Sequence, residues 1–263
     1  LERENVLTGN GSDEILAFAF RAFCGAGQPV AFADVTYGFY KSQAALFDLD
    51  VKIIPLREDF TLHVDDYMDF PGTIVIANPN APTGIAMPTS EIERILQHNP
   101  ESLVVVDEAY VDFGGESVLP LLDRYENLMV VQTFSKSRAM AGMRIGFAIG
   151  HPTLIRALHD VKYSFNSYTL NRTSLSAGVA SVKDRPYLEQ QTAKIIATRE
   201  HAKQVLAELG FQFPDSKSNF LFVTHPDCDA HELFLALREA HIFVRWFDSP
   251  RIRNYLRISI GTE

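Results

Sequence analysis

Short apolar runs rich in β-branched residues alternate with longer segments of helical periodicity from residue 13 to about residue 150. The runs are apolar on both faces, which is typical of strands covered by helices on each side. This alternation predicts an α/β fold with a mainly parallel sheet, in which ligands bind beyond the carboxyl ends of the strands. The strand candidates are residues 28–34, 51–56, 73–78, 102–110, 127–134 and 144–150. The helix candidates are residues 12–24 and 90–99, with Ser12 and Ser90 as N-caps, and residues 151–165.

The pattern changes after about residue 180. A long charged helix over residues 185–210 leads to a strand candidate at 218–225, a helix at 231–241 and two further strands at 242–247 and 255–261. This order predicts a smaller α+β domain. We therefore divide the chain into a large α/β domain, residues 1–183, and a small C-terminal domain, residues 184–263.

Composition and charge exclude several classes of protein. The 263 residues are 46% hydrophobic and 22% charged, as in an ordinary globular protein. The net charge is −9 and there is no long basic run, which argues against binding to nucleic acid. Cys24 and Cys228 form no CxxC pair, which argues against a disulfide framework or a thiolate zinc site. No apolar stretch approaches the roughly 20 residues that span a bilayer. The polar start, LERENVLTGNGSDE, does not resemble a signal peptide, so we expect a cytoplasmic protein.

Two turn-rich segments lie next to the expected strands. TGNGSDE (8–14) is a glycine-rich turn that enters a helix. Its free backbone N–H groups can hold a phosphate, although such turns are also common for structural reasons alone. NPNAPTG (78–84) leaves the side chains of Asn78, Asn80 and Thr83 as donors, and an ordinary connecting turn is the alternative.

Charged residues follow two other strand candidates. Asp107 closes the apolar run LVVVD, where a carboxylate is costly unless a cation or several donors compensate it. A structural carboxylate that caps a loop is an equally good interpretation of Asp107 alone. TFSKSRAMAGMR (133–144) places Lys136 among hydroxyl residues, eight positions before Arg144. Such a lysine is a candidate for Schiff-base chemistry, with a solvated surface lysine as the alternative.

Together these features describe a ligand with a phosphate, a ring nitrogen, a phenolic oxygen and an aldehyde, and pyridoxal phosphate has all four groups. Lys136 would bond the aldehyde, and Asp107 would pair with the ring nitrogen and so make the ring an electron sink. Tyr110 would donate to the ring oxygen, and Tyr37 could stack on the ring face. The phosphate donors would be Thr133, Ser135 and Arg144.

The chain also resembles a known family from about residue 5 to its final residues. The stretches LTGNGSDEIL, VTYGFY, NPNAPTG, VVVDEAYVDF, TFSKSRAMAGMRIGF, SNFLF, VRWF and LRISIGT are similar to those of the fold-type I pyridoxal-phosphate-dependent aminotransferases. Within that group they resemble the histidinol-phosphate aminotransferase family. The resemblance implies a fold-type I transferase with a large domain, a mainly parallel sheet flanked by helices, and a smaller α+β domain.

The resemblance also implies roles for individual residues. Lys136, Asp107 and Tyr110 would be the catalytic set, and Asn80 would contact the cofactor in place of the asparagine that the family has directly before PTG. The remaining cofactor contacts would be Gly11, Ser12, Asp13, Tyr37, Thr133, Ser135 and Arg144. Substrate contacts would be Arg257 to an α-carboxylate, with Asn219 nearby, and Arg245 to the substrate's own phosphate.

Two departures from the family pattern matter. The family usually has asparagine directly before PTG, in contact with the ring oxygen, and this chain has Ala81. Either Asn80 makes that contact or Tyr110 makes it alone, and the sequence does not decide between them. The resemblance further implies an arm that precedes residue 1 and gives a tyrosine to the partner's site, and more chain after residue 263.

The implied activity is transamination between histidinol phosphate and 2-oxoglutarate in histidine biosynthesis, by a homodimer with shared active sites. An aromatic aminotransferase or a threonine-phosphate decarboxylase-like enzyme would share this site, and the effector domain of a transcription regulator is the alternative outside enzymes. The segment HPDCDAH (225–231) carries potential metal ligands, but its spacing matches no common zinc pattern, and we expect no metal site.

Overall fold

The computed structural model describes residues 1–261 and contains a seven-stranded sheet in the order β1-β7-β6-β5-β4-β2-β3. Strands β3, β2, β4, β5 and β6 are parallel, whereas β7 is antiparallel to both β6 and β1. This confirms the predicted α/β class with a mainly parallel sheet. The strands are β1 Val6–Asn10, β2 Val30–Ala33, β3 Val51–Ile54, β4 Thr73–Ala77, β5 Val104–Asp107, β6 Leu128–Thr133 and β7 Ile145–Gly150.

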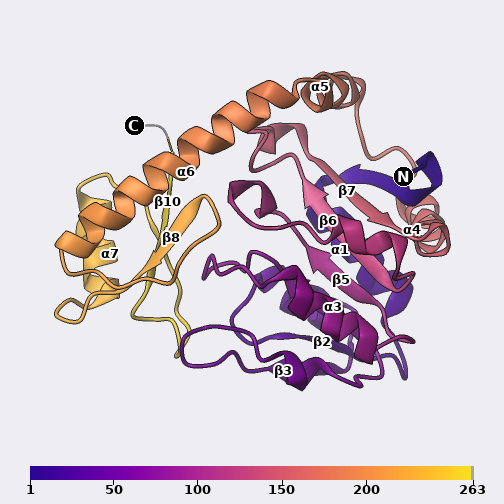
Figure 1. Cartoon of the computed structure of the whole chain (residues 1–263), viewed down its shortest axis with the longest axis horizontal. Helices are drawn as coiled ribbons and strands as arrows, with labels where there is room; N and C mark the ends of the chain where they lie inside the picture. The colour runs from indigo at the N-terminus through magenta and orange to yellow at the C-terminus, as the bar shows by residue number, and fades with distance from the viewer. Residues whose placement is uncertain (262–263) are drawn as a thin grey trace.

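Helices cover both faces of this sheet, which explains why its central strands are apolar throughout (Figure 1). Helices α1 (Gly11–Phe23), α2 (Gly38–Leu46) and α4 (Pro152–Phe165) pack on one face, against side chains such as Val105 and Met129. Helix α3 (Thr89–His98) and the 3₁₀ turn η2 (Val64–Tyr67) pack on the other, against Val104 and Val106. The remaining 3₁₀ turns are η1 Arg3–Asn5, η3 Val111–Phe113, η4 Leu119–Asp123 and η5 Ala141–Met143.

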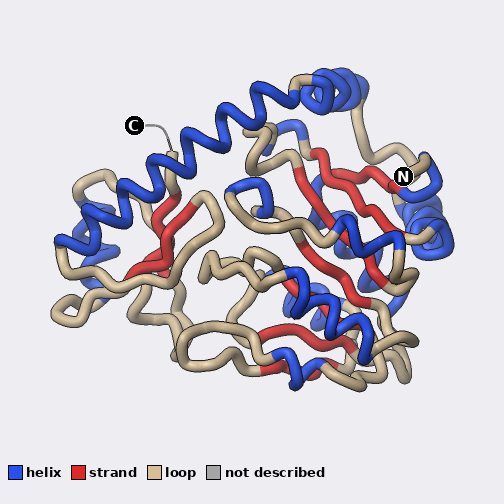
Figure 2. Tube along the Cα trace, in the orientation of Figure 1, coloured by secondary structure: helices blue, strands red, loops and turns tan. Residues whose placement is uncertain are grey.

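The last third of the chain builds a second, three-stranded antiparallel sheet in the order β8-β10-β9. Helix α5 (Arg172–Lys183) is followed by α6 (Arg185–Glu208), which runs from the large sheet to the small one (Figures 1 and 2). The small sheet comprises β8 (Phe220–Val223), β9 (Arg245–Trp246) and β10 (Leu256–Ser259), with α7 (Ala230–Glu239) packed beside it. The predicted order of strand, helix and two strands is therefore present, and the domain boundary near residue 184 stays a prediction.

Arg199 on α6 ties the two sheets together. Its side chain is buried, and its guanidinium donates to the carbonyl of Phe113 at 2.7 Å and to that of Ser218 at 2.9 Å. Phe113 follows β5, and Ser218 precedes β8. The helix is thus hydrogen-bonded to the loops that leave one sheet and enter the other.

Several local predictions were wrong. Helix α1 begins at Gly11 after Asn10, and α3 begins at Thr89 after Pro88, so neither Ser12 nor Ser90 is an N-cap. The segment expected as a turn from residue 8 contains the end of β1, which pairs with β7. Strand β5 ends at Asp107, three residues earlier than predicted. Strand β3 lies at the sheet edge with Lys52 exposed, so one of the supposed fully covered strands is open to solvent.

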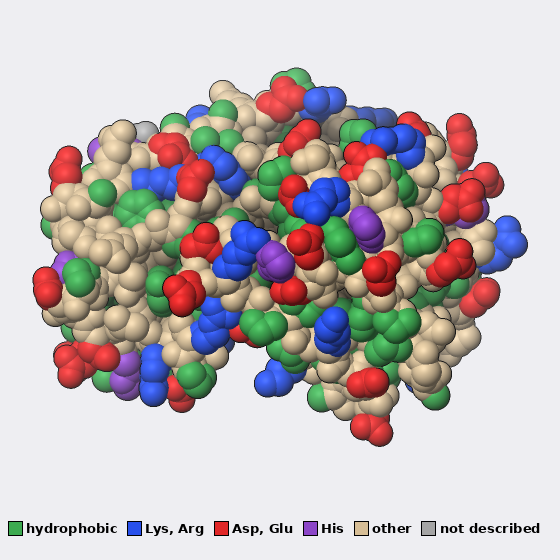
Figure 3. Space-filling model, turned by 60° about the horizontal axis from the view of Figure 1, so that its bottom comes forward, with side chains coloured by type: hydrophobic (Ala, Val, Ile, Leu, Met, Phe, Trp, Pro, Cys, Tyr) green, Lys and Arg blue, Asp and Glu red, His purple; other side chains and the backbone are tan. Residues whose placement is uncertain are grey.

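The surface carries both signs of charge. Figure 3 shows acidic and basic side chains interspersed over the face it presents, without a large patch of one sign. Within residues 1–261, no helix is both long enough and apolar enough to span a bilayer.

Gly146 in β7 allows the first turn of α1 to approach the sheet. A Cβ at residue 146 would collide with the backbone of Gly11 and Ser12. We expect Gly146→Ala to lower the free energy of unfolding by about 1–3 kcal/mol, because backbone on both sides must shift. Gly142→Ala is the matched control, since a Cβ there meets no atom within 4 Å. Urea unfolding of the two variants measures the difference, and equal stabilities would contradict this account of the close approach.

Candidate active site beyond the carboxyl ends of the strands

A cavity of about 140 Å³ lies at the carboxyl ends of β4, β5 and β6. These strands are neighbours in the sheet, so the residues that follow them meet in space. The first turn of α1 and Tyr37, directly before α2, also line the cavity. It brings together most of the residues predicted for the cofactor: Ser12, Asp13, Tyr37, Asp107, Tyr110, Thr133, Ser135, Lys136 and Arg144.

One end of this cavity gathers hydrogen-bond donors. Gly11 opens α1 with φ of 82°, and a Cβ there would collide with the guanidinium of Arg144. Arg144 itself has φ of 54°, a left-handed conformation that non-glycine residues adopt at a cost. Within the described chain its guanidinium makes a single long hydrogen bond, 3.4 Å to the carbonyl of Ala141. The arginine and the free N–H groups of the helix start therefore form a cradle for an anion such as a phosphate.

Two hydroxyl groups lie next to this cradle. The Thr133 hydroxyl donates to the Ser135 hydroxyl oxygen at 3.0 Å and also lies 3.2 Å from the carbonyl of Ile145. The Ser135 amide donates back to the Thr133 hydroxyl oxygen at 3.1 Å. This mutual bonding fixes both side chains at the end of β6, on the wall of the cavity.

The opposite end of the cavity holds the buried carboxylate of Asp107. One of its oxygens accepts from the Tyr40 hydroxyl at 2.8 Å, and the other accepts from the Ala109 amide at 3.2 Å. Burial raises the pKa of Asp107 to about 6, with Asp13 adding to the rise, while the two hydrogen bonds and nearby Lys136 act in the opposite direction. The carboxylate is thus ionised near neutral pH in spite of its burial.

Tyr40 is a site residue that sequence reasoning missed. It is fully buried, and burial together with Asp107 raises its pKa well above the ordinary value, so its hydroxyl stays protonated and donates. The sequence did carry one indication of this role. Tyr40 lies three residues after Tyr37, a spacing that places two side chains on the same side of a helix. The two rings do pack edge to face, with centroids 5.7 Å apart.

Aromatic rings line the cavity around Lys136. Its Nζ lies 5.2 Å from the centre of the Tyr110 ring, a cation–π distance. The Tyr37 hydroxyl donates to Asp13 at 3.0 Å, and this contact holds the ring at the start of α2. The arrangement leaves an amine, a carboxylate and two rings around one small volume.

Asn80 does not line this cavity. Its amide nitrogen donates to the Val35 carbonyl at 3.0 Å and to the Thr83 hydroxyl at 3.1 Å. Its amide oxygen accepts from the Thr36 hydroxyl at 2.8 Å. The side chain therefore points to the far side of its loop, and Ala81 occupies the cavity wall instead.

The predicted substrate residues belong to the small sheet. Arg257 on β10 and Arg245 on β9 are direct partners across antiparallel strands, so two like charges face each other, which is unfavourable unless an anion joins them. Both guanidinium groups lie over the Phe247 ring, at 5.4 Å for Arg245 and 5.8 Å for Arg257. Nε of Arg257 is buried and has no hydrogen-bond partner in the described chain. Asn219 precedes β8, and its carbonyl accepts from the Ile260 amide at 2.8 Å.

Phe220 connects these arginines to the cavity. Its ring lies 5.1 Å from the Arg257 guanidinium and packs edge to face on Tyr110, with centroids 5.1 Å apart. The two groups of predicted residues are thus joined through a pair of aromatic rings.

The residues of HPDCDAH have structural roles. His225 accepts from the amide of Asp227 at 3.1 Å, and Asp229 caps α7 through the amides of His231 and Glu232. Within residues 1–261, no three potential ligands gather in a way that could hold a metal ion.

The hydrogen bond from Tyr40 predicts a pH-dependent stability. Because the folded pKa of Asp107 lies above its unfolded value, ionising it costs stability as pH rises towards and through 6. Removing the Tyr40 hydroxyl raises that pKa further, so Tyr40→Phe should lose about 1 kcal/mol more at pH 8 than at pH 5. Tyr125→Phe is the control, because its hydroxyl binds the half-buried carboxylate of Glu93, whose lowered pKa keeps it ionised at both values. Urea unfolding at the two pH values checks this, and an equal loss from Tyr40→Phe at both would refute it.

Comparison with known proteins agrees with this geometry. The model of the aminotransferase class I and II family matches residues 1–263. The histidinol-phosphate aminotransferase of Brachyspira hyodysenteriae is 48% identical over all of this chain and 75% of that protein, and that of a Marinomonas species is 51% identical with the same coverage. The crystal structure of the Sinorhizobium meliloti enzyme in complex with pyridoxal 5′-phosphate is 26% identical, with a TM-score of 0.87 over 99% of this chain and 73% of that one. The chain belongs to the class I and II aminotransferases and, within them, to the histidinol-phosphate aminotransferase family.

Proposed function

We propose that this chain is a pyridoxal-phosphate-dependent aminotransferase that exchanges the amino group between histidinol phosphate and 2-oxoglutarate, a step of histidine biosynthesis. The observation that carries the proposal is one cavity that combines the amine of Lys136, the buried carboxylate of Asp107 and the anion cradle of Arg144. The identity of about half of all positions to histidinol-phosphate aminotransferases supports the choice of substrate.

The residues of the cavity fit the cofactor. The cradle of Arg144 and the start of α1 suits a phosphate, and Thr133 and Ser135 add hydroxyl donors beside it. Asp107, held ionised by Tyr40, suits a protonated ring nitrogen. Tyr37 offers a ring face for stacking, and the Tyr110 hydroxyl would meet the ring oxygen without help from Asn80, whose amide is already engaged.

The chain's own groups can then perform the proton transfers. When bound, pyridoxal phosphate supplies an aldehyde that condenses with amines and a ring that takes up the electron pair released at the substrate. Lys136 would hold the cofactor through its Nζ, and the same atom, once free, would accept the α-proton of the substrate and donate it again. Asp107 would keep a negative charge beside the ring nitrogen, and Tyr40 orients that carboxylate.

Two arginines suit the two substrates. Glutamate and 2-oxoglutarate bring an α-carboxylate, for which Arg257 with its unpartnered Nε is the natural contact. Histidinol phosphate has no carboxylate, and its phosphate would bind Arg245. The direct pairing of the two arginines across β9 and β10 supports an anionic ligand between them.

We further propose a homodimer with shared active sites. Large apolar side chains are exposed at the end of α4, in the following loop and on α5: Tyr163 63%, Phe165 81%, Tyr168 93%, Leu175 51% and Val179 56%. Helix α5 adjoins the cofactor cavity, since its Ser174 donates to the Met143 carbonyl at 2.7 Å, next to Arg144. A second copy on this surface would bury the apolar side chains and complete the phosphate end of the site. Sedimentation equilibrium of the full-length gene product tests this, and a monomer at micromolar concentration would rule it out.

The cytoplasmic location stays a prediction from the sequence.

Replacement of Lys136 tests the proposed chemistry. Lys136→Ala should lower transamination more than about a thousandfold, because both the covalent anchor and the proton carrier are lost. The visible absorbance band of the lysine-bound cofactor should disappear in the same variant. Lys217→Ala, which removes a surface lysine paired with Asp215, is the control and should keep both properties. Undiminished turnover in Lys136→Ala would end the proposal.

Replacement of Arg245 tests the substrate. Arg245→Ala should lower kcat/KM for histidinol phosphate about 10- to 100-fold through the loss of charged hydrogen bonds, and should change kcat/KM for glutamate far less. Arg253→Ala removes an exposed arginine whose side chain binds only Asp248 among the described residues, and serves as the control. Equal losses on both substrates would count against histidinol phosphate. Faster turnover of phenylalanine or decarboxylation of threonine phosphate by the wild-type enzyme would favour one of the other two activities.

A further inference from the structure

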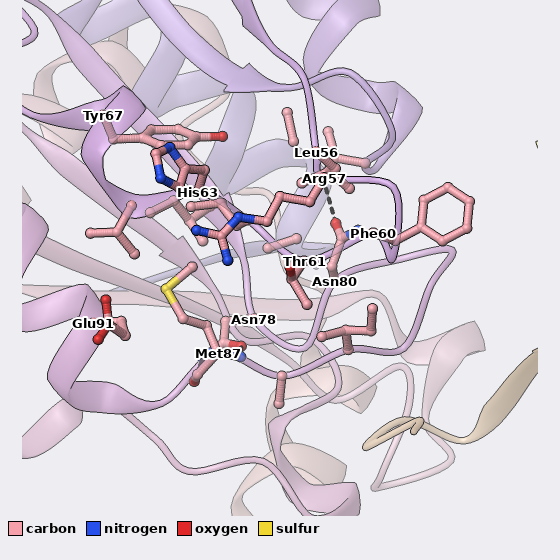
Figure 4. Close-up of a pocket in the computed structure, with 18 of the residues that line it drawn as sticks. Leu56, Arg57, Phe60, Thr61, His63, Tyr67, Asn78, Asn80, Met87 and Glu91 are labelled. Atoms are coloured by element: carbon pink, nitrogen blue, oxygen red, sulfur yellow. Dashed lines mark hydrogen bonds between the residues drawn. The ribbon is translucent and has the colours of Figure 1, made fainter. Parts of the chain in front are cut away.

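A second cavity, of about 370 Å³, lies on the other side of the loop that follows β4. The segment from Leu56 to Tyr67 forms one wall, and the start of α3 forms another (Figure 4). Asn78 and Asn80 line this cavity, whereas Pro79 and Ala81 of the same loop line the cofactor cavity. The proposed transamination uses neither Arg57 nor Tyr67 of this cavity. The volume is that of a small-molecule site.

The hydroxyl of Tyr67 in this cavity lacks a partner. The Tyr67 side chain is fully buried, and no group in the described chain accepts from or donates to its oxygen. Burial raises its pKa, so the hydroxyl is protonated at every physiological pH and is available as a donor. A buried polar group without a partner is uncommon in proteins and costs stability, which calls for an explanation.

Arg57 brings an unpaired positive charge to the same cavity. Figure 4 shows its side chain reaching into the cavity beside His63 and Tyr67, above Asn78 and Met87. The acidic groups on the rim are already engaged, because Asp65 and Glu91 both pair with Arg94, at 3.0 Å and 2.7 Å. Among residues 1–261, no hydrogen bond or ion pair involves the Arg57 guanidinium, whereas that of Arg94 makes two.

Apart from the side chains of Thr36, Thr61 and His63, the remainder of the lining is mostly apolar and comes from three parts of the fold. Val75 and Ile76 belong to β4, and Met87 precedes α3. The other apolar contributors are Leu56, Phe60, Leu62, Val64 and Ile85. A ligand for this cavity therefore needs an anionic group at one end and an apolar body at the other.

We propose that this cavity is a binding site for a small organic carboxylate with a flat apolar body. Arg57 pairs with the carboxylate, the Tyr67 hydroxyl donates to one of its oxygens, and the body lies on Val64, Ile76 and Met87. The site is separate from the substrate arginines of the small sheet, and it depends on no part of the proposed function.

The probe for this site is 4-fluorophenylacetate, titrated into the cofactor-loaded full-length enzyme and followed by ¹⁹F NMR. We expect saturable binding of the probe and none of its neutral analogue 4-fluorophenylacetamide, because the amide cannot pair with Arg57. Arg57→Gln should weaken binding at least about 10-fold, and Tyr67→Phe by about 3- to 10-fold. Lys52→Gln is the matched control, because Lys52 is an exposed cation on the preceding strand β3 and does not line the cavity, and it should leave the affinity unchanged.

A further variant distinguishes this cavity from the active site. Arg257→Gln removes the proposed carboxylate contact of the substrate site, and the probe should bind this variant as it binds the wild type. Binding that is lost in Arg257→Gln, or that is equal in the wild type and Arg57→Gln, would overturn the proposal. Circular dichroism establishes that each variant is folded. If Tyr67→Phe is unstable, the affinity of Arg57→Gln, which alters the cavity mouth, tests the proposal alone.

Discussion

The buried carboxylate of Asp107 is the constraint on which the rest of the site depends. It ends a strand whose other residues are all apolar, where an uncompensated charge would be too costly to keep. Tyr40, the Ala109 amide and the charge of Lys136 compensate it, and each comes from a different part of the fold. Asp107 pairs in register with Ala77 of β4 and Val131 of β6, so the loops after both neighbours are brought to the same carboxylate. The position of the cavity follows from this parallel arrangement.

The parts of the site that follow directly from strand ends could be predicted from the sequence. An apolar run that stops at Asp107, and another that stops before Lys136, place both groups at one edge of a parallel sheet. Tyr40 could not be found in this way, because its contact with Asp107 requires α2 to pack on β5. The direction of the Asn80 side chain also could not be predicted, since two of the three hydrogen bonds that decide it reach Val35 and Thr36 after β2, far away in the sequence. Strand β1 was missed because a glycine-rich segment at a sheet edge has little apolar character.

The small sheet contributes two positive charges, whereas the large sheet contributes the negative charge of Asp107. Arg245 and Arg257 are held opposite each other by the register of a two-residue strand, and Phe247 lies under both. Phe220 then continues the apolar contact to Tyr110 in the cofactor cavity. Rings can keep cations in a partly dry site without neutralising them, so the arginines stay available to an anionic substrate. The relative placement of the two sheets depends in part on Arg199, whose hydrogen bonds reach the loops on both sides.

The loop after β4 separates the two cavities and forms a wall of each. On the cofactor side it presents Pro79 and Ala81. On the other side Asn78 binds both backbone groups of Met87, at 2.7 Å and 3.1 Å, and Asn80 binds Thr36, Val35 and Thr83. The polar side-chain contacts that hold this wall of the cofactor cavity therefore lie in the second cavity. The two walls are therefore built from alternate residues of one loop, Asn78 and Asn80 on one side and Pro79 and Ala81 on the other.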